Sequence, residues 1–314
     1  MPTLALAPTP DGLNRAAGML RAGDLVAFPT ETVYGLGADA RNDIAVARIF
    51  QAKGRPRFNP LIVHLPDLAA AREIAAFPDE ALRLASAFWP GALTLVLPLK
   101  GTALSPLVTA GLDTVALRVP DHPVAHTLLE TFGGPVAAPS ANPSGKVSPT
   151  RAAHVLEGLS GRIEAVVDGG PCPVGVESTI IGFTPTPALL RPGGLPVEAI
   201  EACLGGALTR HAKGARPNAP GQLASHYAPA AAVRLGRTTP EPGDLWLGFG
   251  PTPGADLNLS ESGDLVEAAA NLFHHLRSLD ARAAPGQGIS VAPVPPHGLG
   301  HAINDRLRRA AAPR

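Results

Sequence analysis

The sequence has few cysteines, lysines and aromatic residues, and it has no net charge. Cys172 and Cys203 are the only cysteines, and their spacing matches no metal motif, so a disulfide scaffold and a zinc site are both disfavoured. Aromatic residues make up 4 % of the chain, which disfavours a surface that stacks single-stranded nucleic acid. The formal net charge is zero at pH 7, so any basic site must be local.

No stretch approaches the roughly 20 apolar residues of a membrane span. Residues 1–8 also lack the basic start and the apolar run of a signal peptide, so we expect a cytoplasmic protein without a membrane partner. What the chain does have is length, with 314 residues of which 45 % are hydrophobic and 17 % are charged. This composition predicts a folded core, and the length favours two domains.

Strand-like and helical segments alternate irregularly in the first two-thirds of the chain. Apolar periodicity predicts helices at 11–20, 44–51, 79–88, 123–132 and 151–159. Short apolar runs predict strands at 25–28, 61–65, 93–97, 114–119, 135–138, 165–168, 178–183 and 188–190. Because no strict βαβ rhythm appears, the pattern predicts an α/β sheet of mixed direction.

The remaining third of the chain begins with a segment that lacks apolar periodicity. Residues 208–230 are rich in proline and glycine, which is typical of a tether. Beyond it, strands are expected at 231–235, 244–249 and 289–293, and helices at 265–279 and 301–311. We therefore expect a large domain over 1–207, the tether over 208–230 and a small α/β domain over 231–314.

Three cations and an amide are concentrated in a loop that two prolines stiffen. Lys53, Arg55, Arg57 and Asn59 lie directly before the strand at 61–65. A rigid cationic loop beside a strand end is suited to clamp an anion. No GxxxxGK[ST] sequence is present, so side chains and not a P-loop would hold the phosphates. The alternative is a solvated turn, and in both cases we expect the loop to face solvent.

Two further polar segments follow strands. In residues 139–145, Ser140 and Asn142 offer a hydroxyl and an amide, although an ordinary turn would have a similar composition. Residues 29–34 are polar after an apolar strand, which suggests a site at a sheet edge, or only a threonine cap for a helix starting near residue 40. Residues 35–40 match GxGxxA, but the intervening residues 29–34 argue against a dinucleotide loop and favour a tight turn.

Several polar side chains lie in apolar surroundings. His64 is either a satisfied core residue or a ligand contact. Arg118 lies between apolar neighbours in a strand, so it must either find an anion or bear the cost of desolvation. Glu177 and Arg191 are candidates to pair with each other, and either could instead face a ligand. Tyr227 in the tether either anchors the tether to a domain surface or acts as a lid over a ligand.

Together these motifs resemble the YrdC-type L-threonylcarbamoyladenylate synthases in their two-domain form. The matching segments are residues 28–37, 53–56, 59–61, 139–145, 177–180, 190–193, 225–229 and 297–306. The resemblance implies a YrdC-like mixed, twisted sheet with a concave basic face and a smaller Rossmann-like C-terminal domain. It implies that L-threonine, bicarbonate and ATP give threonylcarbamoyl-AMP and pyrophosphate, and that the product passes to the machinery that threonylcarbamoylates tRNA.

The resemblance also implies roles for individual residues. Lys53 and Arg55 would neutralise the triphosphate and assist departure of pyrophosphate. The implied ATP contacts are Lys53, Arg55, Asn59, Thr114, Ser140, Asn142, Ser148, Arg191 and Tyr227. The implied threonine contacts are Thr32, His64, Arg118, Ala138 and Ser178, with Ala138 contributing only its backbone. No carboxylate cluster has metal-ligand spacing, so we expect Mg²⁺ to arrive with ATP and to be held mainly by phosphate oxygens.

Two other interpretations use the same fold. A hydrogenase-maturation carbamoyltransferase contains a YrdC-like module, but it also carries zinc-finger cysteines that this chain lacks. A non-enzymatic RNA-binding module would use the concave basic face, and neutral net charge with few aromatic residues leaves only a contact that reads duplex shape. Release of pyrophosphate that requires both threonine and bicarbonate distinguishes the three.

Overall fold

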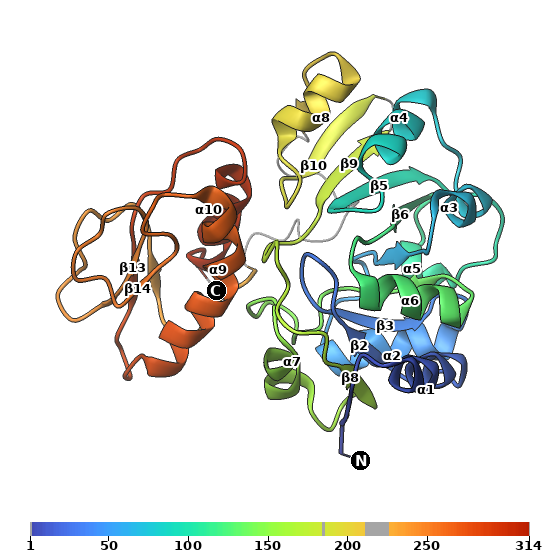
Figure 1. The fold of residues 1–314 in the computed structure, drawn as a ribbon, viewed down its shortest axis with the longest axis horizontal. Helices are drawn as coiled ribbons and strands as arrows, with labels where there is room; N and C mark the ends of the chain where they lie inside the picture. Colours follow the sequence, from blue (N-terminus) through green and yellow to red (C-terminus); the bar gives the residue numbers. More distant parts are fainter. Residues whose placement is uncertain (1, 184–185, 211–225, 314) are drawn as a thin grey trace.

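The computed structural model describes residues 2–183, 186–210 and 226–313, and these residues form two bodies (Figure 1). The larger body is built on one mixed sheet, and the smaller one contains the end of the chain. The helices of the larger body are α1 (Pro10–Arg21), α2 (Asp43–Lys53), α3 (Leu68–Ile74), α4 (Asp79–Phe88), α5 (Pro106–Thr109), α6 (Pro123–Phe132), α7 (Ala152–Leu159) and α8 (Val197–Leu204).

The described strands of the larger body form one 11-stranded sheet in the order β1-β8-β2-β3-β7-β4-β6-β5-β9-β10-β11. Their bounds are β1 (Leu4–Leu6), β2 (Val26–Phe28), β3 (Gly35–Asp39), β4 (Ile62–His64), β5 (Leu93–Pro98), β6 (Thr114–Arg118), β7 (Val136–Ala137), β8 (Ala165–Val167), β9 (Thr179–Phe183), β10 (Pro187–Arg191) and β11 (Thr209–Arg210). The sheet contains parallel pairs, such as β4 with β6, and antiparallel pairs, such as β5 with β6. The expected mixed α/β sheet is therefore confirmed.

Alternate residues of the strands pack on opposite faces of this sheet. In and beside β2, Leu25 and Ala27 join the cluster that contains α2, α4 and α7, whereas Val26 and Phe28 join the cluster that contains α1 and α6. In the part of the sheet that contains β4, β6, β5 and β9, residues of one face belong to the first of these clusters. On the other face only a small cluster around Ile62 forms, and this face borders the site described below.

The smaller body is a parallel sheet of four described strands, in the order β12-β15-β13-β14, with two helices. Its elements are β12 (Val233–Arg234), β13 (Leu245–Gly248), β14 (Leu257–Asn258), α9 (Leu265–Arg282), β15 (Ile289–Val291) and α10 (Gly300–Ala310). Its apolar core extends across the boundary between the bodies, since Val33, Val147 and Val176 of the larger body belong to the same buried cluster. The two bodies are thus joined by a shared apolar core.

One expectation about the strands was wrong. Residues 35–40 were expected to form a tight turn, yet Gly35–Asp39 is strand β3, antiparallel to β2 and β7. A side chain at Gly37 would place its Cβ 2.9 Å from the ring of Phe28 and 3.0 Å from Val136, so this strand needs glycine for close packing and not for a turn. The sequence analysis also missed β1, β11, β14, α3, α5 and α8.

The domain boundaries remain a prediction. Most of the expected tether, residues 211–225, lies outside the described residues, and β11 pairs with β10 at its start. In the part of the chain that the structure describes, no helix is long and apolar enough to cross a membrane.

The loop before Glu177 allows close contact between the bodies at Gly175. Gly175 has φ +75°, and a Cβ there would lie 2.3 Å from the carbonyl oxygen of Ala269 in α9. We expect Gly175→Ala to displace α9 and loosen the contact between the bodies, visible as faster limited proteolysis and a lower Tm. Gly236→Ala is the matched control, because Gly236 has a similar φ of +68° but no neighbour within 4 Å of the added Cβ. Equal effects of both substitutions would mean that backbone strain alone, and not the contact, is responsible.

Two histidines link the bodies through a hydrogen bond that needs neutral imidazoles. His154 Nδ1 accepts the N–H of Thr150 at 3.2 Å, so the proton of the neutral ring is on Nε2. This Nε2 lies 3.3 Å from Nδ1 of His274 in α9, and the rings stack at 5.4 Å. Burial lowers the pKa of His154 to about 3, and the charges of Arg277 and, more weakly, Arg151 act in the same direction together with His274.

This arrangement predicts a loss of stability in acid. The unfolded chain takes up a proton at this histidine below about pH 6.5, whereas the folded protein does so only near pH 3. The contribution of neutral His154 to the free energy of unfolding is therefore complete above pH 6.5. It is lost progressively as the pH falls from 6.5 towards 3. Urea unfolding across this range should give a smaller slope of unfolding free energy against pH for His154→Gln than for the wild type. Parallel curves would contradict the prediction.

Candidate active site

A small hollow of about 50 Å³ lies where the ends of β4 and β6 meet the boundary between the two bodies. His64 and Arg118 are register partners at the carboxyl ends of these two parallel strands, the usual place for a ligand in an α/β sheet. The expected site residues that line the hollow are Arg55, His64, Arg118, Ala138, Ser140, Ser178, Arg191 and Tyr227. Residues from segments far apart in the sequence therefore converge here.

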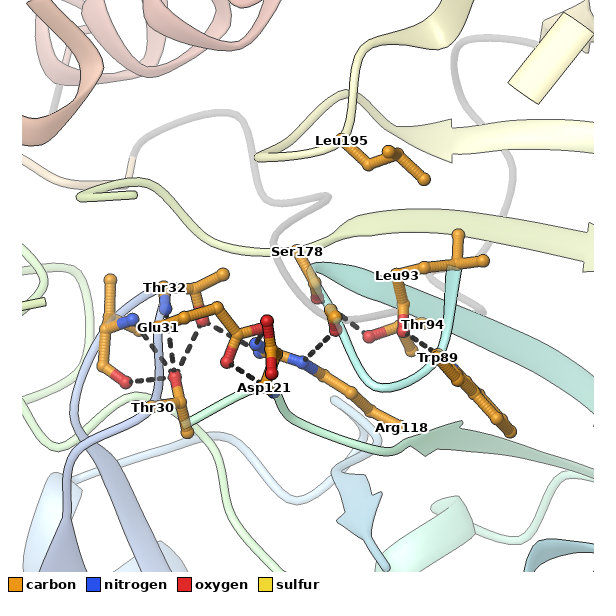
Figure 2. A network of polar contacts seen from close by, with 12 residues as sticks. Thr30, Glu31, Thr32, Trp89, Leu93, Thr94, Arg118, Asp121, Ser178 and Leu195 are labelled. Carbon is orange, nitrogen blue, oxygen red and sulfur yellow. Dashed lines mark hydrogen bonds and ion pairs between the residues drawn. The ribbon is translucent and has the colours of Figure 1, made fainter. Parts of the chain in front are cut away.

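Arg118 is held by a carboxylate and two oxygens (Figure 2). Its Nη2 pairs with Oε1 of Glu31 at 2.6 Å, its Nη1 donates to Oγ1 of Thr32 at 2.8 Å, and its Nε donates to the carbonyl of Gly91 at 3.2 Å. The other oxygen of Glu31 accepts the N–H of Asp121 at 3.0 Å. The expectation that Arg118 finds an anion is confirmed, but sequence reasoning had not identified Glu31 as a site residue.

The loop that carries Glu31 and Thr32 is fixed by Thr30. Its Oγ1 accepts the backbone N–H groups of Thr32 and Val33, both at 3.2 Å, and donates to the carbonyl of Val33 at 2.7 Å. Neither threonine caps α2, whose N-cap is Asn42. The polar segment after β2 is thus a preorganised part of the hollow and not a helix cap.

Ser178 is placed by hydrogen bonds to two neighbouring elements. Its Oγ lies 2.7 Å from Oγ1 of Thr94 in β5, and it accepts a hydrogen bond from Nη2 of Arg191 at 3.2 Å. The same guanidinium donates to the carbonyl of Ser178 through Nε at 3.1 Å and through Nη2 at 2.9 Å. Ser178 and Arg191, which were expected to contact different substrates, are therefore in direct contact.

The expectation that Lys53 and Arg55 face solvent was wrong, because both are buried, whereas Arg57 in the same loop is exposed. Lys53 is the last residue of α2 and is 3 % exposed, and Arg55 follows the left-handed Gly54 and is 9 % exposed. The ammonium of Lys53 donates to the carbonyls of Ser140, at 2.5 Å, and Asn142. The chain turns at Gly54 (φ +61°) and directs both side chains inward, where local sequence composition suggested an exposed turn.

Burial without a counter-charge lowers the pKa of both Lys53 and Arg55. Nη2 of Arg55 donates to the carbonyl of Pro60 at 2.9 Å, and no carboxylate among the described residues forms an ion pair with Lys53 or Arg55. Burial lowers the pKa of Lys53 well below its usual range, and the charge of Arg55 lowers it further. Burial likewise lowers the pKa of Arg55 to about 10. Buried cations in this situation are stabilised when an anion enters.

Glu177 is bonded to a residue of the smaller body. Its Oε1 accepts the hydroxyl of Ser148 at 2.5 Å, and its Oε2 pairs with Nε of Arg306 in α10 at 2.9 Å. Burial by itself would raise the pKa of Glu177, but the charges of Arg306 and Arg191 lower it to about 2. Arg306 was not singled out from the sequence. Its position in the sequence could have indicated a buried arginine, because Arg306 shares the apolar face of a helix with Ile303 and Leu307.

Tyr227 lies inside the hollow and is 1 % exposed. It adopts φ +61°, stacks on Phe273 of α9 at 5.4 Å, and has the guanidinium of Arg306 over its ring at 5.4 Å. The next residue, Ala228, donates its N–H to the carbonyl of Gly145 at 2.9 Å. The described end of the expected tether thus lines the hollow. A lid over a ligand would lie in the same position.

The other expected residues surround the hollow to different degrees. Thr32, Lys53, Asn142 and Ser148 reach it through the hydrogen bonds given above, and Asn59 is buried beside Arg55, to which its carbonyl is bonded. Thr114 lies at the opposite end of β6 from Arg118 and does not line the hollow. Among the described residues, no group of three or more His, Cys, Asp and Glu could hold a metal ion.

Unsatisfied polar atoms concentrate in this region. Seven buried side-chain atoms lack a hydrogen-bond partner in the described part of the chain, and four of them belong to the site. They are Asn59 Oδ1, His64 Nδ1, Asn142 Oδ1 and Arg306 Nη2. Since buried polar groups are nearly always paired in folded proteins, these atoms are candidates for contacts with a ligand.

These features define a two-domain α/β protein with a ligand site that favours anions. The profile of the Sua5_yciO_yrdC family, described as "Telomere recombination", matches residues 18–193. A second profile, described as "Threonylcarbamoyl-AMP synthase, C-terminal domain", matches residues 195–312. The chain therefore belongs to the threonylcarbamoyl-AMP synthase family in its two-domain Sua5 form, and it is an enzyme. The resemblance found in the sequence is confirmed.

Individual relatives agree with this assignment. The chain is 45 % identical to threonylcarbamoyl-AMP synthase of Bacillus subtilis, over 96 % of this chain and 93 % of the relative. It is also 45 % identical to the enzyme of Pyrococcus abyssi, over 94 % and 93 %. The crystal structure of P. abyssi Sua5 with L-threonine superposes with a TM-score of 0.90, at 42 % identity over 98 % of this chain and 97 % of that one.

More distant structures share the fold alone. Full-length HypF is 22 % identical with a TM-score of 0.53, over 59 % of this chain and 30 % of that one. That likeness is much weaker than the match to Sua5.

The contacts of Glu31 predict a selective effect on amino-acid binding. Glu31→Gln should loosen the orientation of Arg118 while leaving the buried cations Lys53 and Arg55 unchanged. We expect the KM for L-threonine to rise about tenfold, the size expected when one charge-assisted hydrogen bond worth about 1.4 kcal/mol is weakened. The KM for ATP should stay within twofold. If both KM values rise together, Glu31 supports the fold and does not position Arg118.

Proposed function

We propose that this protein forms threonylcarbamoyl-AMP and pyrophosphate from L-threonine, bicarbonate and ATP, and so supplies the modification of an adenosine in tRNA. One observation supports this above all. Two buried cations without counter-charges lie beside a hollow whose other side holds an arginine with its own carboxylate. The first arrangement suits a polyphosphate, and the second suits an amino acid.

The threonine subsite centres on Arg118. A guanidinium has five N–H donors, and three are used by Gly91, Thr32 and Glu31. The two that remain suit a bidentate contact with the carboxylate of threonine. Thr32, His64, Ala138 and Ser178 would contact the rest of the amino acid. Burial, together with the charge of Arg118, lowers the pKa of His64 to about 3, so His64 meets the substrate as a neutral imidazole.

The ATP subsite lies on the cationic side. Lys53 and Arg55 would neutralise the triphosphate and stabilise the departing pyrophosphate, each with an effect of about 3 kcal/mol on the transition state. The other proposed ATP contacts are Asn59, Thr114, Ser140, Asn142, Ser148, Arg191 and Tyr227. Thr114 is the weakest of these, because it does not line the hollow as it stands.

The reaction needs positioning more than a covalent nucleophile. The amine of threonine captures CO₂ derived from bicarbonate, an oxygen of the resulting carbamate attacks the α-phosphorus, and pyrophosphate leaves. Carbamates are short-lived, so the site must exclude water while they form. The hollow of about 50 Å³ is too small for ATP, since ligand pockets usually exceed roughly 300 Å³. We infer that the segment around Tyr227 moves out to admit ATP and returns afterwards.

Magnesium fits this site only as a companion of ATP. The side chains on the phosphate side are cations and amides, which do not form a protein-held metal site. We expect Mg²⁺ to be bound mainly by phosphate oxygens, with the cations of the protein placed around it. We also propose that the product passes to a tRNA-modifying machinery. The zero net charge gives no separate reason to expect tight binding of tRNA.

The decisive experiment is mass-spectrometric detection of the adenylate after incubation with L-threonine, ¹³C-bicarbonate and ATP. The product should carry one ¹³C atom, and pyrophosphate release should stop when threonine or bicarbonate is omitted. Turnover of ATP without threonine would overturn the proposal, and so would tight RNA binding with no turnover.

A further inference from the structure

Arg306 is a side chain of the smaller body that pairs with Glu177, a residue that lines the hollow of the larger body. It extends from α10, is 0 % exposed and is the largest fully buried side chain of the described residues. Besides the Nε contact with Glu177, its Nη1 donates to the carbonyl of Pro192 at 2.7 Å and to Asp305 at 2.9 Å. Its guanidinium lies over the ring of Tyr227.

The partners of Arg306 belong to the proposed phosphate side. Glu177 is hydrogen-bonded to Ser148, and Pro192 follows Arg191 in the chain. The charges also interact, since burial lowers the pKa of Arg191 and the charge of Arg306 lowers it further. A guanidinium from the second domain thus extends the row of cations that begins with Lys53 and Arg55.

One donor of Arg306 is not used. Nη2 is buried and has no hydrogen-bond partner among the described residues. If Arg306 served only to join the two bodies, a contact that leaves a buried N–H unpaired would be a poor solution, because such a group loses its hydration and gains nothing. A phosphate oxygen would satisfy Nη2 without disturbing the bond from Nε to Glu177 or the bonds from Nη1.

We propose that Arg306 is a phosphate-binding residue contributed by the C-terminal domain, and that its Nη2 binds an oxygen of the pyrophosphate portion of ATP when the domains are closed. This inference rests on the proposed function for the identity of its ligand. It gives the C-terminal domain a direct part in the chemistry, in addition to packing against Tyr227. Arg306 then strengthens the grip on the leaving group, and it withdraws whenever the domains separate.

The test measures binding of inorganic pyrophosphate to the full chain by isothermal titration calorimetry. Arg306→Met should weaken binding at least tenfold, equivalent to about 1.4 kcal/mol. Arg309→Met is the matched control, since Arg309 lies one turn further along α10 and bonds the same Asp305. It should leave the affinity within twofold. Binding of L-threonine should be unchanged in both variants, whereas a merely structural role of Arg306 would weaken both ligands.

A second variant separates loss of Arg306 from exposure of Glu177. In Arg306→Met the carboxylate of Glu177 loses its partner and could itself repel pyrophosphate. The double variant Glu177→Gln/Arg306→Met removes that charge, and it also replaces the single variant should the latter fail to fold. Binding that remains weak in the double variant supports the proposal. Binding restored to the wild-type level overturns it, as does wild-type protein that does not bind pyrophosphate.

These outcomes are independent of turnover. A wild-type protein that binds pyrophosphate through Arg306 but forms no adenylate would refute the proposed function alone. An active enzyme whose affinity for pyrophosphate is unaffected by Arg306→Met would refute the present inference alone.

Discussion

The site depends on positive charge that is buried before any anion is present. Lys53 and Arg55 are removed from water, and their described partners are backbone carbonyl groups. Burying a cation in this way is unfavourable, and the packing of the sheet against α2 must offset it. In return the cations are already in position when a ligand arrives, so little reorganisation is needed during the reaction.

The two sides of the hollow differ in the way their charges are balanced. Arg118 has its own carboxylate in Glu31, so that side is close to neutral before ligand binding. On the other side the cations outnumber the carboxylates, and Glu177 is shared between Ser148 and Arg306. This difference corresponds to the ligands proposed for each side, because an amino acid carries one charge of each sign whereas a triphosphate is strongly anionic.

The smaller body packs against a residue that lines the hollow. The apolar contact through Val176 and the close approach at Gly175 place α9 next to the hollow. Tyr227 stacks on a residue of that helix, and Arg306 lies above Tyr227. The contacts between the two bodies and the lining of the hollow therefore share the residue Tyr227.

The sequence by itself predicted the mixed sheet and many of its helices and strands, because these depend on local periodicity. Its motifs, such as residues 53–56 and 139–145, also pointed to segments that converge at the hollow. It did not determine which way side chains face. The glycines of strand β3 suggest a turn when only the sequence is considered. In the structure they leave room for the ring of Phe28. Local composition predicts exposed side chains for Lys53 and Arg55. It does not identify Glu31 as the partner of Arg118 or Arg306 as the partner of Glu177. Arg306 and Glu177 lie 129 residues apart in the sequence and meet across the boundary between the two bodies. Burial and pairing across such distances follow from the packing of the whole chain, which local composition does not encode.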